Sequence, residues 1–362
     1  MENKLKQYFP MLKSREEILK EIDNSIMMTE KFYSWKEEEQ QEFLDCCTGV
    51  KGVKLLYDVY FKEIMNPETV PERLEEFLSV LLKQNVKIMD VLPGDATRLS
   101  DECSLLIMDI LIRFEDGTYC NVEVQKIGYA FPGERCACYS ADLLLRQYKR
   151  VRGQKKKHFK YKDIKGVYTI VLFEKSPVQF HKYPDIYTHY FCQKSNTGLE
   201  MNLLQNYVFI PLDIFSQTVH NNGIRNLLEA WLVFLSTDSP ELIISLITEY
   251  PKFKAMYEHL YYICQNVERM MEMYSAELKI LDRNTVQYMV DQMQETIDSQ
   301  SAELNTKQAT INLLSAEVNT KQESIDSLSL ELNMKQEALQ SKEQQLEEAH
   351  QKIKELQQLL GK

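Results

Sequence analysis

The stretch MDILIRFEDGTYCNVEVQK, residues 108–126, reads as two strands joined by a tight turn. Its residues are mostly β-branched, aromatic or aliphatic, and the Asp-Gly pair at 116–117 is a turn signal at its centre. Two carboxylates, Asp109 and Glu123, interrupt this apolar pattern. The fold and the chemistry of the chain both depend on which face of the hairpin carries these two acids.

The length of the loop decides which residues of the two strands face one another. A two-residue turn places Ile110 opposite Glu123, which mixes charged and apolar residues on both faces. A three-residue loop, with Gly117 left-handed as a bulge residue, pairs Ile110 with Val122 and makes one face wholly apolar. The other face then carries Asp109 directly opposite Glu123. We predict the three-residue loop, because it separates the core residues from the polar ones.

Two carboxylates side by side on a sheet favour a cation between them. Like charges directly opposite one another destabilise a sheet by up to about 1 kcal/mol. Mg²⁺ prefers oxygen ligands and retains several waters and substrate phosphates, and Mn²⁺ accepts the same ligands. Such an ion stabilises a phosphodiester transition state and helps to generate hydroxide. The alternative is a solvated pair of acids on an edge strand, without a metal.

The rest of the chain predicts an α/β domain around this hairpin. After Pro71, segment 71–84 has its leucine and phenylalanine residues at helical spacing. Segment 132–150 is helical in composition, which gives a β-β-α-β order with the strands that flank it. Short segments rich in β-branched and aromatic residues predict further strands at 86–92, 166–173, 187–193 and 206–212.

Changes in composition divide the chain into four parts. Strand signals stop beyond residue 223, and three helical segments follow. From about residue 290 the composition shifts to Glu, Gln, Lys, Ser and Leu. We expect an N-terminal helical extension at 1–55, an α/β core at 56–222, a helical packing segment at 223–289 and a coiled-coil tail at 290–362.

The tail repeats every fourteen residues, as SAELNTKQ, SAEVNTKQ and SLELNMKQ show. An aliphatic residue recurs at every seventh position from Ile297 to Leu360. Three residues further on, only about every second position is apolar, with Leu314 and Leu328 alternating with lysines. We predict a long C-terminal helix that self-associates as a weak coiled coil, with its orientation open. A lone amphipathic helix is the alternative.

Composition excludes several classes of protein. The net charge of −11 argues against a chain that coats nucleic acid over its whole surface. The eight cysteines form no CxxC pair and the six histidines no ligand-spaced cluster, so neither a zinc site nor a disulfide framework is supported. No stretch approaches the roughly 20 apolar residues of a membrane-spanning helix. We therefore expect no membrane association and a cytoplasmic location.

One basic segment stands out against the acidic total. Residues 146–165 carry ten lysines or arginines and a single acid, with three aromatic residues between them. Contacts from such a segment to DNA phosphates give affinity without sequence preference. The alternative is a solvated loop. Because the segment follows the predicted helix after the carboxylate strands, it can lie near them. The residues expected at DNA are Arg146, Lys149, Arg150, Arg152, Lys155, Lys156 and Lys157.

The constellation around the hairpin resembles a known family. It comprises Asp109, Glu123-Val124-Gln125, Arg135, Tyr139, Gln147, Gly153 and Tyr161. Together with the segments DVYFKEIMN at 58–66 and LEEFLSVLL at 74–82, it resembles the PD-(D/E)XK nuclease family transposases, also called the Rpn family of recombination-promoting nucleases. The resemblance runs from residue 55 to about residue 240.

The resemblance implies a restriction-endonuclease-like α/β core, a mixed sheet flanked by helices, and Mg²⁺-dependent DNA cleavage linked to transposition or recombination. It assigns Asp109 and Glu123 to the metal and to catalysis. Gln125 stands where a lysine usually orients water, and its neutral amide cannot supply that charge. We expect Arg135 and Tyr139, four residues apart on one helical face, to contact substrate phosphate or brace the site; the alternative is that they only pack on the sheet.

Because Gln125 stands in place of the usual lysine, a second function remains open. An inactive nuclease fold would serve as a DNA-binding or protein-interaction module, with the tail as its oligomerisation arm. Lys126 follows Gln125, but on a regular strand its side chain points to the opposite face.

Overall fold

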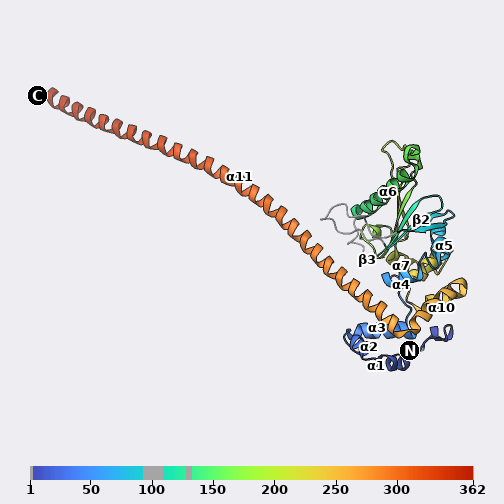
Figure 1. Cartoon of the computed structure of the whole chain (residues 1–362). Helices are drawn as coiled ribbons and strands as arrows, with labels where there is room; N and C mark the ends of the chain where they lie inside the picture. Colours follow the sequence, from blue (N-terminus) through green and yellow to red (C-terminus); the bar gives the residue numbers. More distant parts are fainter. Residues whose placement is uncertain (1–2, 93–108, 128–132, 362) are drawn as a thin grey trace. The chain divides into compact units, whose positions relative to one another are not determined.

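The computed structural model describes residues 3–92, 109–127 and 133–361. The chain divides into two compact units, residues 1–284 and 285–362. The first unit contains a mixed sheet with helices around it, and the second is helical throughout its described part (Figure 1).

Six strands form the sheet in the order β1-β2-β3-β4-β6-β5. β1–β2, β2–β3 and β5–β6 are antiparallel pairs, whereas β3–β4 and β4–β6 are parallel, so the sheet is mixed as predicted. The strands are β1 (Ile88–Val91), β2 (Ile110–Phe114), β3 (Tyr119–Ile127), β4 (Val167–Lys175), β5 (His189–Phe191) and β6 (Gln205–Pro211). Every predicted strand is present.

The β2–β3 hairpin has the predicted register. Ile110 pairs with Val122, and Ile112 pairs with Cys120. The Phe114 N–H donates to the Thr118 carbonyl at 2.8 Å, and Gly117 has a φ of +92°. The three-residue loop and its left-handed glycine are therefore confirmed. A side chain at Gly117 would be strained in this conformation.

The two faces of the hairpin belong to different cores. Alternate residues from Ile110 to Phe114 and from Cys120 to Val124 are buried in the larger core, which the helices of the N-terminal region and of residues 212–274 share. On the opposite face, Leu111 and Tyr119 pack in a smaller core with Tyr139 from α6. Because strand side chains alternate, Asn121 and Glu123 lie on this second face.

The helices match the sequence-based expectations. α5 and α6 occupy the segments predicted at 71–84 and 132–150, and α8, α9 and α10 are the three helices expected after residue 223. The helices are α1 (Arg15–Asp23), α2 (Ile26–Tyr33), α3 (Glu37–Thr48), α4 (Asp58–Ile64), α5 (Pro71–Leu82), α6 (Gly133–Lys155), α7 (Leu212–Asn222), α8 (Leu227–Ser236), α9 (Pro240–Glu249), α10 (Lys252–Gln265) and α11 (Val267–Leu360).

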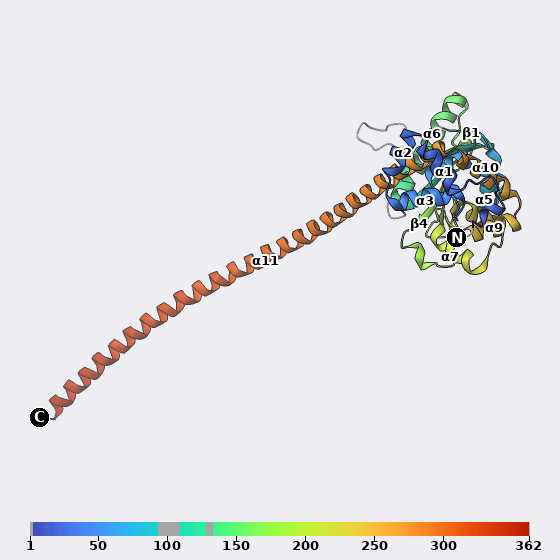
Figure 2. The same ribbon diagram turned by 90° about the horizontal axis from the view of Figure 1, so that it is seen from below.

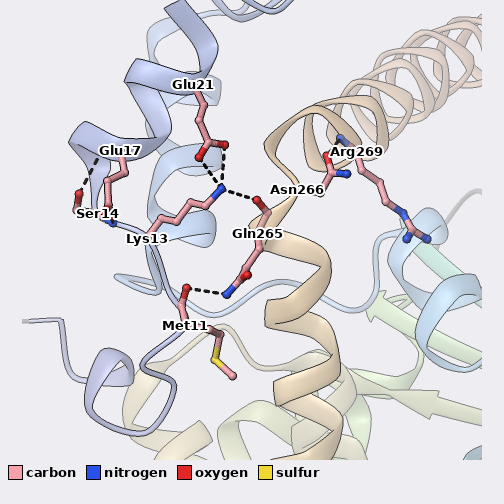
Figure 3. A network of polar contacts seen from close by, with 8 residues as sticks. All are labelled: Met11, Lys13, Ser14, Glu17, Glu21, Gln265, Asn266 and Arg269. Carbon is pink, nitrogen blue, oxygen red and sulfur yellow. Dashed lines mark hydrogen bonds and ion pairs between the residues drawn. The ribbon is translucent and has the colours of Figure 1, made fainter. Parts of the chain in front are cut away.

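A polar network joins the N-terminal segment to the end of α10 (Figure 3). The Lys13 ammonium contacts the Glu21 carboxylate at 2.6 Å and donates to the Gln265 carbonyl at 2.6 Å. The Gln265 side chain donates to the Met11 carbonyl at 2.9 Å. These contacts connect residues that are more than 250 positions apart in the chain. The N-terminal helices are therefore part of the first unit and not a loose extension.

α11 begins in the first unit and supplies the whole described part of the second (Figure 2). Asn266 caps its start by accepting a hydrogen bond from the Arg269 N–H at 2.9 Å, and Tyr274 packs edge-on against Trp35. From Ile297 to Ile353 the aliphatic residues of the seven-residue repeat are more than half exposed, as at Ile297 with 57%. No helix in the described part of the chain is long and apolar enough to cross a bilayer.

Candidate functional site

β2 and β3 bring the two predicted acids side by side. Asp109 immediately precedes β2, and Glu123 lies in the middle of β3. The Asp109 N–H donates to Glu123 Oε1 at 3.3 Å, and the Val124 N–H donates to Asp109 Oδ2 at 2.8 Å. Each carboxylate is thus tied to the backbone of the other strand, which fixes both on the face that α6 covers.

The environment of Glu123 disfavours its negative charge. The residue is 5% exposed. Burial, and then the negative charge of Asp109, raise the pKa of Glu123 to about 8. A hydrogen bond from the Asn121 amide at 2.8 Å and the charge of Arg135 oppose this shift without cancelling it. The charged form of Glu123 is therefore unfavourable in the protein alone, and a cation beside the two carboxylates would offset that cost.

A lysine from α4 also reaches this site. Lys62 Nζ lies 3.0 Å from Asp109 Oδ1. The Asp109 side chain is 12% exposed and that of Lys62 is 42% exposed. Lys62 belongs to the segment DVYFKEIMN at 58–66, which contributes to the family resemblance, but the sequence pattern indicates no role for it in the site. No spacing rule connects residue 62 to residue 109, so only the fold shows that they meet.

Gln125 follows Glu123 on the same face of β3. It is half-buried and pairs with Phe173 of β4 in the parallel ladder. Glu123 and Gln125 are two positions apart on β3, so their side chains are neighbours on one face. Gln125 therefore lies where the sequence predicted it, beside the acids. The Lys126 side chain falls outside the described residues.

α6 closes the site with Arg135 and Tyr139. The Arg135 guanidinium donates to Tyr139 Oη at 3.0 and 2.8 Å, and its positive charge lowers the pKa of Glu123 against the dominant effect of burial. Tyr139 is fully buried in the smaller core, while Arg135 is exposed. The predicted helical pair therefore forms, with the tyrosine holding the arginine close to the carboxylates.

The basic segment lies at the other end of α6. Gln147 donates to the Gly117 carbonyl at 3.4 Å, and Arg150 donates to Tyr119 Oη at 3.4 Å. These contacts place the C-terminal half of α6 beside the hairpin turn. Lys156 is 17 residues beyond Tyr139, which corresponds to about 25 Å along the helix. Closeness in sequence therefore does not bring the lysines against the acids.

Residues of the basic segment differ in how they are held. Arg146 pairs with the buried Asp142 at 2.7 Å, and Arg150 lies 3.3 Å from Asp90. Lys155 pairs with Asp163 at 2.7 Å. Arg152 contacts Tyr148 through a hydrogen bond and a cation–π contact. Of the seven basic residues expected at DNA, five are exposed: Lys149, Arg152, Lys155, Lys156 and Lys157.

The donors at the site fit a hard divalent cation. Both hydrogen bonds that Glu123 accepts from described residues fall on Oε1, which leaves Oε2 to face a metal. Asp109 Oδ1 is the second candidate ligand, and Lys62 contacts it in the metal-free protein. Two carboxylate oxygens supply part of an octahedral shell, and water and phosphate oxygens complete it in Mg²⁺ sites. Within the described residues, no group of three or more His, Cys, Asp or Glu is placed to hold a metal on its own.

Comparison with known proteins identifies the family. A family model described as PD-(D/E)XK nuclease family transposase matches residues 55–292. The match covers about two thirds of the chain and includes α4, the β2–β3 hairpin and α6. No curated protein and no solved structure matches the chain.

Proposed function

The chain belongs to the PD-(D/E)XK nuclease family transposases, and we propose that it is a Mg²⁺-dependent DNA endonuclease that acts in transposition or recombination. The observation that carries this proposal is the buried carboxylate pair. The Asp109 backbone N–H donates to Glu123 Oε1 at 3.3 Å within the region that the family match contains, and the pKa of Glu123 is raised by burial and by the charge of Asp109.

The residues of the site have separate roles in this proposal. Asp109 and Glu123 would hold Mg²⁺ or Mn²⁺, which when bound stabilises the charge that develops on the scissile phosphate. Gln125 orients the attacking water by hydrogen bonding, and it cannot act as a cation. Arg135 contacts a phosphate oxygen while Tyr139 holds its guanidinium in place.

The reaction is hydrolysis of a phosphodiester bond. The water oxygen forms a bond to phosphorus as the bond from phosphorus to the bridging ester oxygen breaks. The proton lost by the water passes to solvent, and the leaving oxygen takes up a proton from solvent. No oxidant or further substrate is needed.

DNA would be held along α6. The exposed basic residues at its C-terminal end are Lys149, Arg152 and the run at 155–157. Lys156, about 25 Å from Tyr139 along the helix, would lie roughly seven base pairs of a duplex away from it. These residues would contact phosphates at a distance from the cleaved bond, and so contribute affinity without sequence preference.

The tail would bring copies of the chain together. The aliphatic side chains at every seventh position from Ile297 to Ile353 form an exposed column. Burying such a column between helices is the usual source of coiled-coil stability. Three lysines of the second column form pairs at 2.6 Å with glutamates four residues earlier, at Lys307, Lys321 and Lys335. We propose a weak coiled coil whose lysine layers lower its stability.

Nicking of supercoiled plasmid DNA tests the proposed function. The full chain should nick DNA with Mg²⁺ or Mn²⁺ and stop when EDTA is added. Asp109→Ala and Glu123→Ala should each slow cleavage by orders of magnitude, since removing metal-assisted charge stabilisation costs several kcal/mol of barrier. Unchanged tryptophan fluorescence would show that both variants fold.

The neutral amide of Gln125 favours a second function, that of an inactive nuclease fold that binds DNA or protein. A wild-type chain that binds duplex DNA, but neither cuts it nor gains thermal stability with either metal, would establish that function in place of the endonuclease.

A further inference from the structure

Lys62 occupies one of the two oxygens that a metal would use. Its ammonium lies 3.0 Å from Asp109 Oδ1, while Asp109 Oδ2 accepts the Val124 N–H at 2.8 Å. A cation that binds the carboxylate pair therefore meets Lys62 at Oδ1. Two cations at one oxygen repel each other, so Lys62 must move when the metal enters.

The backbone of Lys62 is anchored by its helix, and its side chain extends from α4 to Asp109. The helix α4 buries Phe61 and Ile64 completely in the larger core. Glu63 pairs with Arg269 of α11 at 2.6 Å, which fixes the outer side of the same helix. The Lys62 side chain is 42% exposed, and its flexible four-carbon stem allows the ammonium to move several ångströms from a fixed Cα.

Positive charge approaches the carboxylate pair from two helices. Its strand position two residues after Glu123 carries Gln125, which has no charge. Arg135 supplies a second cation from the α6 side, where its guanidinium is held by Tyr139. Lys62 approaches from α4, on the Asp109 side of the pair. A phosphate bound to a metal on these acids would thus have a cation within reach on each side.

We infer that Lys62 is a catalytic residue that exchanges partners: it neutralises Asp109 in the free protein and moves to the scissile phosphate when a divalent metal takes Asp109 Oδ1. It supplies the charge that Gln125 lacks. This inference rests on the proposed function for its substrate, a DNA phosphate, but its effect on metal affinity can be measured without cleavage.

The test compares Lys62→Met and Lys62→Arg with a matched control. Lys87 pairs with Glu75 at 2.7 Å, and the side-chain exposures of that pair, 57% and 12%, resemble those of Lys62 and Asp109, 42% and 12%. Lys87→Met therefore removes a similar ion pair outside the site. Methionine retains most of the lysine stem in both variants, so the charge is the main change.

Three measurements on the full chain test Lys62→Met, which should change Mg²⁺ affinity in one direction and DNA affinity and cleavage rate in the other. Mg²⁺ binding without DNA, followed by calorimetry, should tighten about tenfold because a competing ammonium is gone. Binding of a duplex in Ca²⁺, used in place of Mg²⁺ to keep the duplex uncut, should weaken severalfold. Cleavage at saturating Mg²⁺ should slow by about 100-fold or more, as when one charge-stabilising donor is lost. Lys62→Arg should restore much of the DNA affinity, and Lys87→Met should change none of the three.

Each outcome decides the inference. Lys62→Met with unchanged or weaker Mg²⁺ binding, or with wild-type cleavage, would overturn it, because Lys62 would then only brace the fold. If the wild-type chain does not cut DNA at all, the proposed endonuclease fails, yet opposite shifts of Mg²⁺ and DNA affinity would still support the exchange of partners. Parallel effects of Lys62→Met and Lys87→Met on all readouts would contradict it.

Discussion

Glu123→Gln should stabilise the metal-free protein, and by more at higher pH. The raised pKa means that the folded state keeps a proton on Glu123 between about pH 4.5 and pH 8, whereas the unfolded state releases it near 4.5. Because the unfolded state binds fewer protons in this window, the free energy of unfolding of the wild type falls as pH rises. Glutamine does not titrate and retains the oxygen that accepts from Asn121 and Asp109.

The magnitude follows from the pKa values. Each pKa unit corresponds to about 1.4 kcal/mol. Between pH 5 and pH 7.5 the advantage of Glu123→Gln should therefore grow by about 3 kcal/mol, given a folded-state pKa of about 8. Below pH 4.5 the two proteins should differ little, since Glu123 is protonated in both states of the wild type.

Urea unfolding followed by tryptophan fluorescence measures this difference. The two tryptophans, Trp35 and Trp231, both lie before residue 285, so the signal reports the first unit and not the tail. Adding Mg²⁺ at pH 7.5 should stabilise the wild type with release of up to about one proton per metal, and should do less for Glu123→Gln.

A carboxylate with a structural partner provides the opposite control. Burial opposes ionisation of Glu75, but hydrogen bonds from Lys87 and from the Ile88 N–H outweigh it and lower the pKa of Glu75. Its stabilising effect is present above its unfolded pKa and lost as pH falls. Glu75→Gln should therefore destabilise the protein at neutral pH. If Glu123→Gln lowers the free energy of unfolding at neutral pH as Glu75→Gln does, or if its stabilising effect does not change with pH, ionisation of Glu123 is not unfavourable in the folded protein. The reasoning would then be refuted.

Two further predictions concern DNA and assembly. Changing the three lysines at 155–157 to glutamine should weaken duplex binding, measured by fluorescence anisotropy. The slope of log affinity against log salt concentration should become shallower by about 2 to 3, because each phosphate contact contributes about 0.9 to it. An unchanged slope would show that the three lysines do not contact DNA. Removing residues 290–362 should leave a folded protein whose oligomeric state, measured by light scattering, is lower. Making Leu314 and Leu328 polar should weaken assembly of the full chain. The same number of subunits in the wild type, the truncated chain and the leucine variant would contradict the coiled coil.

The local pattern was sufficient to predict the hairpin. Its register follows from one physical requirement, that Ile110, Ile112 and Val122 share a buried face, and only the three-residue loop with Gly117 left-handed satisfies it. Placing Asp109 beside Glu123 then needs no tertiary information. The strands and helices of the α/β core follow from the same periodicity and from turn residues at their ends.

Long-range contacts could not be predicted in this way. Lys62 meets Asp109 because α4 packs its apolar face into the larger core at a particular angle, and no local pattern encodes that angle. The same limit applies to Lys13 and Gln265, which lie 252 positions apart. Charges that act on a site from another element are therefore found from the fold, even when the site itself is read from the sequence.

α6 separates the carboxylate site from the basic segment. α6 presents Arg135 and Tyr139 to the carboxylates at its start, and its C-terminal half runs beside the hairpin turn through Gln147. The helix rises about 1.5 Å per residue, so the lysines after its end lie far from the acids although they follow the same element. In the proposed endonuclease, α6 would set the distance between the cleaved bond and the phosphates that the lysines contact. Substitutions among the lysines after α6 could then change DNA affinity without disturbing the carboxylates near the start of the helix.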